Sequence, residues 1–250
     1  MGFTLPFICL RDYTNIQKDD GERLIMKIKA LVAVRSGSVR VINKNLRPFA
    51  GSNLLEIKLL QLKRIANLDG IVVNSNDDGM LRLAQNHGCE VVKREGIYAT
   101  SEVLMSDVYQ NMAENFTGDV IAYINVTNPL IRDQSLYDAI EMFKKLHGTF
   151  DSINTAHYVK EFMFQDNKPI NYDLAKQPRS QDLPDILALN FACNVISKEQ
   201  MVKCKNVVGE SPYIYPIDEI EASDIDNEID FEFTEFVYKK KILQDEVSIG

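Results

Sequence analysis

The chain of 250 residues has little cysteine and no long hydrophobic run. No stretch approaches the roughly 18 consecutive apolar residues of a membrane-spanning helix, so we expect no membrane segment. The first ten residues, MGFTLPFICL, are faintly apolar but lack the basic region and the cleavage pattern of a secretion signal. The four cysteines, at positions 9, 89, 193 and 204, are spaced for neither a metal site nor a compact disulfide framework. We therefore expect reduced cysteines and a cytoplasmic protein.

The sequence also lacks an excess of positive charge. Its 28 basic and 36 acidic side chains give a formal net charge of −8, which argues against a nucleic-acid partner, because phosphate backbones attract positive surfaces. The P-loop pattern GxxxxGK[ST] is absent, and no GxGxxG pattern follows the first expected strand. We therefore expect neither a P-loop enzyme nor a standard dinucleotide-binding fold. Any phosphate site must be local.

Short strand-like runs alternate with amphipathic helical patterns through the first 150 residues. This alternation is typical of an α/β protein whose mostly parallel, Rossmann-like sheet is flanked by helices. Asn53 or Ser52 can cap the first helix, and Asp77 can cap the second. The expected strands lie near residues 28–34, 70–75, 89–93 and 119–126, and the expected helices begin near residues 53, 77, 101 and 133.

The pattern changes after residue 150, where a smaller element of strands follows. Asp166 and Asn167 favour a hairpin turn within it. Further on, Ser197 and Gln200 have the spacing of a capping box at the start of a short helix. We divide the chain into an N-terminal extension (1–25), a main domain (26–240) that includes the smaller element (150–185), and a C-terminal tail (241–250).

Charge is distributed unevenly along the chain. Residues 23–64 contain ten basic side chains and a single acid, Glu56, whereas residues 218–235 contain nine acids and no base. Charge runs are weak signals, so one interpretation is that the two faces complement each other or are simply solvated. The detailed placement of the charges favours a more specific interpretation.

The basic segment RSGSVRVINKN begins where the first expected strand ends. In open α/β sheets, ligands bind beyond the carboxyl ends of the strands. Gly37 and Ser38 can present backbone N–H groups to a phosphate, while Arg35, Arg40 and Lys44 add positive charge. Such a loop fits a triphosphate. The alternative is that these cations only solubilise a turn.

The acidic segment offers a complementary feature. In an extended chain, Asp224 and Asp226 point to the same side and can hold Mg²⁺ together with phosphate oxygens. Asp230 lies farther on and can serve as a helix cap. The alternative interpretation is that both aspartates are ordinary surface acids.

Several ordered motifs together resemble the acylneuraminate cytidylyltransferases, or CMP-sialic acid synthetases, and their relatives that activate legionaminic, pseudaminic and 2-keto-3-deoxy sugars. The resemblance covers roughly residues 26–240. RSGSVRVINKN is similar to the family's R-x-G-S-K-x-x-x-x-K-N motif, QPRSQDLP to Q-P-R-x-x-L-P, and ASDIDNEIDFEFTEF to the metal-binding D-I-D-T-x-x-D segment. The first motif supplies the nucleotide-binding candidates Arg35, Gly37, Ser38, Lys44 and Asn45, and VVNSNDDGMLRLAQNHGCEVVKREGIYAT places Arg94 at the family's nucleotide-contacting arginine. Arg40 is a further candidate, because it can replace the lysine that the family has at position 39.

The sequence departs from the family pattern at several positions. Val39 stands where the family has a lysine, and Asn125 replaces the glutamine that reads the sugar in relatives. Phe191 replaces the glycine after Asn190, and Asn194 replaces a tyrosine. We therefore expect an altered acceptor pocket. The candidate sugar-binding residues are Arg179, Asn190 and Asn125.

The resemblance implies an enzyme that transfers CMP from CTP to the anomeric hydroxyl of a 2-keto-3-deoxy sugar acid and releases pyrophosphate. Arg35, Arg40 and Lys44 would hold the phosphates, Asp224 and Asp226 would hold Mg²⁺, and Asp226 is a candidate base. The family also implies a homodimer that pairs through residues 150–185. Two alternatives stay open: a nucleotidyltransferase for another sugar, and a catalytically weak nucleotide-binding homologue.

Overall fold

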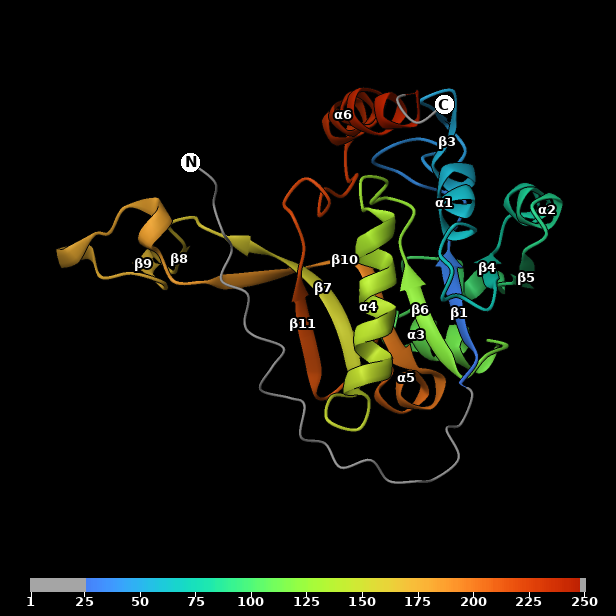
Figure 1. Ribbon diagram of the computed structural model, residues 1–250, viewed down its shortest axis with the longest axis horizontal. Coiled ribbons are helices and arrows are strands. Elements are labelled where there is room, and N and C mark those ends of the chain that lie inside the picture. Colours follow the sequence, from blue (N-terminus) through green and yellow to red (C-terminus); the bar gives the residue numbers. More distant parts are fainter. Residues whose placement is uncertain (1–25, 248–250) are drawn as a thin grey trace.

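A seven-stranded sheet forms the centre of the protein (Figure 1). The computed structural model describes residues 26–247, with side chains as far as residue 241. In spatial order the strands are β11 (Pro212–Pro216), β7 (Ser152–Val159), β10 (Ile186–Ser197), β6 (Val120–Ile124), β1 (Ile28–Ala33), β4 (Ile71–Ser75) and β5 (Glu90–Lys93).

The sheet is parallel except for one strand. β1 pairs in parallel with β4 and β6, β4 pairs in parallel with β5, and β11 pairs in parallel with β7. β10 runs antiparallel to both β6 and β7. Strands β4 and β6 are buried along their whole length, as expected for parallel strands covered on both faces. The predicted mostly parallel α/β sheet is confirmed.

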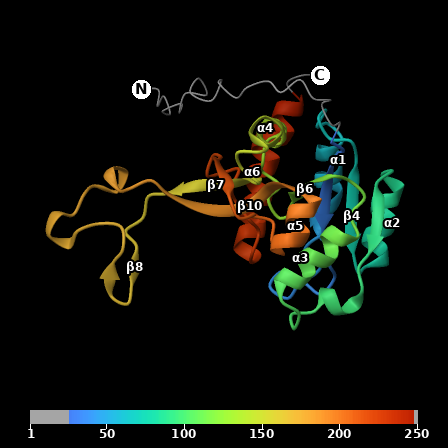
Figure 2. The ribbon, with the colours of Figure 1, turned by 90° about the horizontal axis from the view of Figure 1, so that it is seen from below.

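Helices cover both faces of the sheet, and each face has its own hydrophobic core (Figure 2). Ile28, Ala30 and Val32 of β1 face one core, and Leu31 faces the other. The first core is closed by α1 (Leu54–Leu62), α2 (Asp78–Asn86), α4 (Asp133–Leu146) and α6 (Glu228–Val247), and the second by α3 (Met105–Glu114) and α5 (Lys198–Cys204). In the described part of the chain, no helix is long and apolar enough to span a membrane.

The predicted helix starts are correct at α1, α2, α4 and α5, and α4 begins at Asp133 as expected. Asn53 Oδ1 accepts from the N–H of Glu56 at 2.9 Å, and Asp77 Oδ1 accepts from Met80 at the same distance. Ser197 caps α5 through the N–H of Gln200 at 3.1 Å. These are local signals, and each is satisfied by side chains within one turn.

The helix expected from residue 101 starts later. The N–H of Glu102 bonds to the hydroxyl of Thr100, which holds this stretch in a turn, and α3 begins at Met105 without a side-chain cap. At the other end of the chain, α6 continues to Val247 and so crosses the boundary expected at residue 240. Residues 1–25, the expected N-terminal extension, lie outside the described residues.

An arm projects from the body between β7 and β10 (Figures 1 and 2). It holds the short hairpin of β8 (Phe164–Gln165) and β9 (Lys168–Pro169), and its turn residues Asp166 and Asn167 have φ of 50° and 61°. Asn and Asp tolerate this left-handed region, so the predicted turn is confirmed. The smaller element was expected to begin at residue 150, but residues 152–159 form β7 of the central sheet. The arm therefore begins after Val159.

One lysine lies inside the first core. Lys58 of α1 is 0% exposed, and its Nζ donates to Gln61 Oε1 at 2.7 Å and to the carbonyl of Asn128 at 3.0 Å. Burial lowers the pKa of Lys58 from 10.5 to about 7. The amine therefore gives up its proton near neutrality in the folded protein but keeps it in the unfolded chain.

This difference predicts a pH-dependent stability. Between about pH 7 and 10.5 the unfolded chain binds one more proton than the folded protein, so the free energy of unfolding rises with pH. Relative to Lys58→Met, the wild type should gain up to about 1.4 kcal/mol per pH unit from pH 7 to 9, measured by urea unfolding. Lys63→Met, which changes an exposed lysine at the end of α1, is the control and should follow the wild type. Parallel pH profiles for Lys58→Met and the wild type would contradict the prediction.

Candidate functional site

A cleft of about 210 Å³ opens at the carboxyl ends of β1 and β6. This is the edge at which ligands bind in open α/β sheets. It is lined by residues from the end of β1 and the loop after it, by residues 125–127 after β6, and by Asp226, whereas Gly37 and Asp224 are not among its lining residues. The lining includes the following residues predicted from the sequence: Arg35, Ser38, Arg40, Lys44, Asn45, Asn125 and Asp226.

The loop after β1 is held from within and from its neighbours. Asn45 is buried, and its Nδ2 donates to the carbonyl of Arg35 at 3.2 Å, which closes the base of the loop. Arg35 Nη1 donates to the carbonyl of Ala99 at 2.7 Å. Gly37 has a φ of +81°, a conformation that a side chain would strain. Asn45 therefore shapes the loop.

The acidic segment around Asp224 and Asp226 contacts this loop. The N–H of Ile225 donates to the carbonyl of Thr127 at 3.0 Å, which attaches the segment to the end of β6. Lys44 Nζ donates to the carbonyl of Ile225 at 2.5 Å, and Arg40 pairs with Asp226 at 2.8 Å. The basic loop and Asp226 therefore meet in one cleft, although 186 positions separate Arg40 from Asp226 in the chain (226 − 40). Asp224 does not line the cleft but lies close enough to act on the charge of Lys44.

Burial and neighbouring charges shift the pKa values of Lys44 and Asp224. The pKa of Lys44 is lowered, chiefly by partial burial, while Asp224 and Asp226 act to raise it. The pKa of Asp224 is raised, first by partial burial of its carboxylate and then by its neighbour Asp226, against a hydrogen bond from Thr127. A carboxylate in this setting gains from a nearby cation.

The two aspartates fit a divalent cation only in part. In the described part of the chain, no group of three or more His, Cys, Asp or Glu side chains is arranged to hold a metal ion. Carboxylate oxygens suit Mg²⁺, which usually binds through one or two carboxylates and completes its shell with water and phosphate oxygens. Asp224 and Asp226 match that partial set, so a magnesium ion here would need a phosphate ligand.

Asp230 fixes the acidic segment from the start of α6. Its Oδ2 accepts from the N–H groups of Asp226 and Asn227, both at 2.9 Å, and Asn227 Oδ1 accepts from the N–H of Asp230 at 3.1 Å. This reciprocal arrangement is a capping box in which Asn227 is the cap of α6 and Asp230, inside the first turn, is its partner. Asp230 therefore supports the cap, and the expectation that it is itself the helix cap is wrong. Asp230 also sets the backbone position of Asp226.

Arg94 does not line the cleft. It is 6% exposed, and its guanidinium donates to Asn74 Oδ1 at 2.6 Å and to the Asn74 carbonyl at 3.1 Å. Its pKa is lowered, mainly by burial, with Arg35 as a further cause. Arg94 therefore lies near Arg35 but braces the end of β4.

Two of the three candidate sugar-binding residues also lie outside the cleft. Arg179 is on the arm, exposed, and paired with Asp182 at 2.7 Å. Asn190 is 9% exposed and accepts from Thr155 Oγ1 at 2.7 Å, while its Nδ2 is buried without a partner. Phe191, at the position of the family glycine, has a φ of 55°. Of the three candidates, only Asn125 lines the cleft.

Sequence reasoning missed the residues that hold the acidic segment in place. Asn128 Nδ2 donates to the carbonyls of Ala222 at 3.4 Å and Ser223 at 3.1 Å. Glu221 is 3% exposed and accepts from Ser135 Oγ at 2.6 Å and from the backbone and side chain of Arg132. The only available signal was the polar run that directly follows the apolar strand VIAYI.

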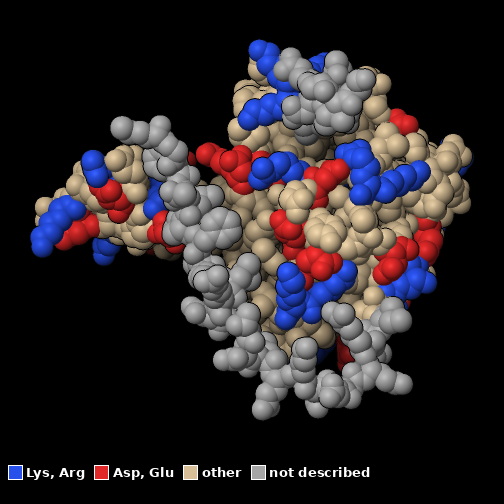
Figure 3. Space-filling view, in the orientation of Figure 1, with Lys and Arg blue, Asp and Glu red and all other residues tan. Residues whose placement is uncertain are grey.

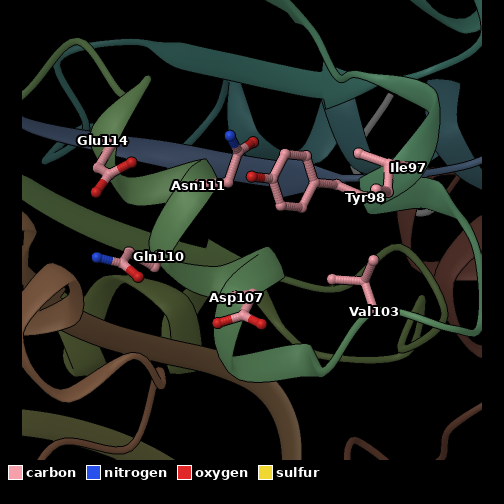
Figure 4. Close-up of a pocket in the computed structure, with 7 residues that line it drawn as sticks. All are labelled: Ile97, Tyr98, Val103, Asp107, Gln110, Asn111 and Glu114. Atoms are coloured by element: carbon pink, nitrogen blue, oxygen red, sulfur yellow. The ribbon is translucent and has the colours of Figure 1, made fainter.

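A second hollow lies between the 3-10 helix η2 (Gly96–Ala99) and α3 (Figure 4). Its volume is about 350 Å³, and its charged lining residues are Asp107 and Glu114. No lysine or arginine lines it, so a polyanion would meet only negative charge there. The cleft at β1 and β6 is therefore the better phosphate site.

On the face drawn in Figure 3, acidic and basic side chains are interspersed, without a broad basic surface.

Comparison with known proteins bears on the same region. The profile of a family described as cytidylyltransferase matches residues 29–245, which is most of the chain. The chain belongs to the cytidylyltransferase family. The matched range contains the whole cleft, both the loop after β1 and the acidic segment.

Individual relatives and structures agree with this assignment. The chain is 25% identical over 231 residues to post-translational flagellin modification protein B of Campylobacter coli, covering 87% of this chain and 97% of that one. It is 24% identical to the CMP-N,N'-diacetyllegionaminic acid synthase of Campylobacter jejuni, with the same coverage. A solved structure of CMP:2-keto-3-deoxy-manno-octonic acid synthetase complexed with CTP has the same fold, with a TM-score of 0.64 and 9% identity over 86% of this chain and 99% of that one.

The setting of Arg94 predicts a structural cost for its removal. Arg94→Met should lower the free energy of unfolding by about 1–3 kcal/mol, because two acceptors on the buried Asn74 lose their donor. Urea unfolding measures the change. Arg82→Met, which changes an exposed arginine of α2, should stay within about 0.5 kcal/mol of the wild type. Equal stabilities of the two variants would contradict the bracing role.

Proposed function

We propose that this cytidylyltransferase transfers CMP from CTP to the anomeric hydroxyl of a 2-keto-3-deoxy sugar acid, such as a sialic, legionaminic or pseudaminic acid. The observation that carries the proposal is the meeting of Arg40 and Lys44 with Asp226 in one cleft, with Asp224 beside Lys44. Full-length similarity to a protein named as a CMP-legionaminic acid synthase supports the acceptor class.

In the proposed complex the loop after β1 binds the triphosphate. Ser38, Arg35, Arg40 and Lys44 line the cleft, and we propose that the three cations neutralise the phosphate charge while the N–H groups of Ser38 and the preceding Gly37 donate to phosphate oxygens. Arg40 must leave Asp226 to do so, which is feasible because both side chains are largely exposed and such pairs are weak. Nucleotide binding thereby frees the Asp226 carboxylate.

The proposed chemistry is an in-line displacement. The sugar hydroxyl oxygen forms a bond to the α-phosphorus, the bond from that phosphorus to the bridging oxygen breaks, and pyrophosphate leaves. Asp226, freed from Arg40, takes the hydroxyl proton. Asp224 and Asp226 would hold Mg²⁺, which would supply Lewis-acid stabilisation of the phosphate charge.

For the acceptor, we propose a site completed by a second copy of the chain. Asn125 faces the cleft of its own chain, whereas Arg179 lies on the projecting arm. The arm carries exposed Phe164, Ile170 and Leu174, and such surfaces are typical of interfaces. In a homodimer, the arm of one copy would bring Arg179 to the sugar carboxylate in the cleft of the other.

A second candidate function is a nucleotide-binding homologue with weak activity. Val39 favours it, since this side chain is 89% exposed at the mouth of the cleft and supplies no charge where relatives have a lysine. Binding of CTP without pyrophosphate release for any acceptor would support this alternative over the enzyme.

The deciding experiment mixes the protein with CTP, Mg²⁺ and a panel of 2-keto-3-deoxy sugar acids and follows pyrophosphate. We expect release with at least one acid. Asp224→Ala combined with Asp226→Ala should reduce turnover by at least about 100-fold, because the carboxylates that would hold the metal are gone. Asp218→Ala, an exposed acid earlier in the same segment, is the control. Unaltered turnover in the double variant would exclude the metal role, and circular dichroism would show whether the fold is kept.

The arm gives a separate prediction. Arg179→Ala should raise the KM for the sugar acid by about 10-fold or more and leave the KM for CTP unchanged, because a guanidinium that pairs with a carboxylate is lost. Lys176→Ala, also on the arm, is the matched control. Light scattering should show a dimer. An unchanged acceptor KM, or a monomer at working concentration, would contradict the shared site.

A further inference from the structure

Lys58 carries a buried amine without an anionic partner. It is fully buried on α1 between Ile57 and Leu59, and both acceptors of its Nζ are neutral, the side-chain oxygen of Gln61 and the carbonyl of Asn128. Within the described residues, no carboxylate forms an ion pair with it. Its neighbours that carry or can carry charge are Cys193, Asp133 and Arg64.

Such a group is expensive to bury. An ammonium loses its hydration on entering the core, and hydrogen bonds to neutral oxygens replace that hydration only in part. A leucine or methionine at this position would continue the apolar face of α1, whose neighbours in the first core are leucines and isoleucines. A polar group buried at such a cost is commonly part of a functional site or supports one, and the contacts of Lys58 Nζ indicate which site it supports.

The amine holds the loop that follows β6. From the Asn128 carbonyl the contacts continue in two directions toward the acidic segment. The side chain of Asn128 donates to the carbonyl of Ser223 at 3.1 Å, directly before Asp224. The preceding residue, Thr127, accepts the N–H of Ile225 at 3.0 Å and hydrogen-bonds to Asp224 through its side chain.

Gln61 supports the other end of the same loop. It accepts from Lys58, and its Nε2 donates to the carbonyl of Ile131 at 2.6 Å and to Asp133 Oδ1 at 3.0 Å. One turn of α1 therefore binds both ends of residues 128–131. Lys58 itself does not line the cleft, so it has no direct access to a bound nucleotide.

We propose that Lys58 is a positioning residue: by holding the Asn128 carbonyl, its amine keeps the loop after β6, and with it Asp224 and Asp226, aligned with the basic loop. The functional part of this inference rests on the proposed cytidylyltransferase activity. The structural part, that Lys58 holds the loop after β6 and the acidic segment in place, does not rest on that activity, because it is argued from hydrogen bonds within the chain.

The test compares Lys58→Met with Lys29→Met. Lys29 is also a buried lysine, but it pairs with Glu90 near the amino ends of β1 and β5, away from the cleft at the carboxyl ends. Its loss therefore controls for general destabilisation. Amide hydrogen exchange is measured at Ile225 and at the amides of β1. Lys58→Met should speed exchange at Ile225 by at least about 10-fold relative to β1, because its acceptor Thr127 is no longer held. Lys29→Met should not produce this local change.

Two further readouts address function. Lys58→Met should weaken binding of CTP in the presence of Mg²⁺, measured by calorimetry, and lower kcat by about 10–100-fold, as expected when an outer support of a metal site is removed. If the wild type turns over no acceptor, the proposed function fails, while the exchange experiment still decides the positioning role. Unchanged exchange at Ile225 in Lys58→Met would overturn the proposal, as would wild-type kcat and CTP affinity in a variant that does exchange faster.

A second variant covers the case in which Lys58→Met does not fold. Asn128→Ala leaves the buried amine and its bond to the backbone in place but removes the link to Ala222 and Ser223. It should speed exchange at Ile225 in the same way. If both variants fold, combining them should add little to either alone, because both act through one chain of contacts. Wild-type exchange in Asn128→Ala, or fully additive effects in the double variant, would contradict the proposed route.

Discussion

The site depends on one backbone hydrogen bond, from the N–H of Ile225 to the carbonyl of Thr127 at the end of β6. It attaches a segment near the end of the chain to the central strands of the sheet. Together with the hydrogen bonds from Asn128 to Ser223 and from Asp226 to Asp230, it fixes the two aspartates relative to the basic residues after β1. With it, the carbonyl of Ile225 receives Lys44, and Asp226 reaches Arg40. Opposite charges from two distant parts of the chain are thus held close together on one side of the sheet.

Local sequence signals predicted the elements of the fold well. The caps at Asn53, Asp77 and Ser197 and the turn at Asp166 involve residues within a few positions of one another, so their physics is contained in short windows. The direction of β10 was not predictable in this way. An apolar run has no signature of parallel or antiparallel pairing, and the pairing is set by the path of the chain through the arm.

The candidate site was predictable in part. The phosphate-binding role proposed for the loop after β1 was inferred from its place at a strand end. Its contact with Asp226 links distant positions, and no spacing rule predicts such a contact. The burial of Lys58 is the feature that the sequence predicted least. Its neighbours in sequence suggest a helix face but not a charged group in the core, because the acceptors that hold it come from a loop 70 positions away. Arg94 and Asn190 matched motif positions, yet their side chains contact the sheet rather than the cleft.

The single reversed strand, β10, has a consequence for how this protein can diversify. β7 ends and β10 begins at the same edge of the sheet that carries the cleft, so the excursion between them starts and finishes beside the ligand. An antiparallel pair accepts a connection of almost any length without a crossover. This junction can therefore change in size and composition over generations while the cleft and its sheet stay as they are.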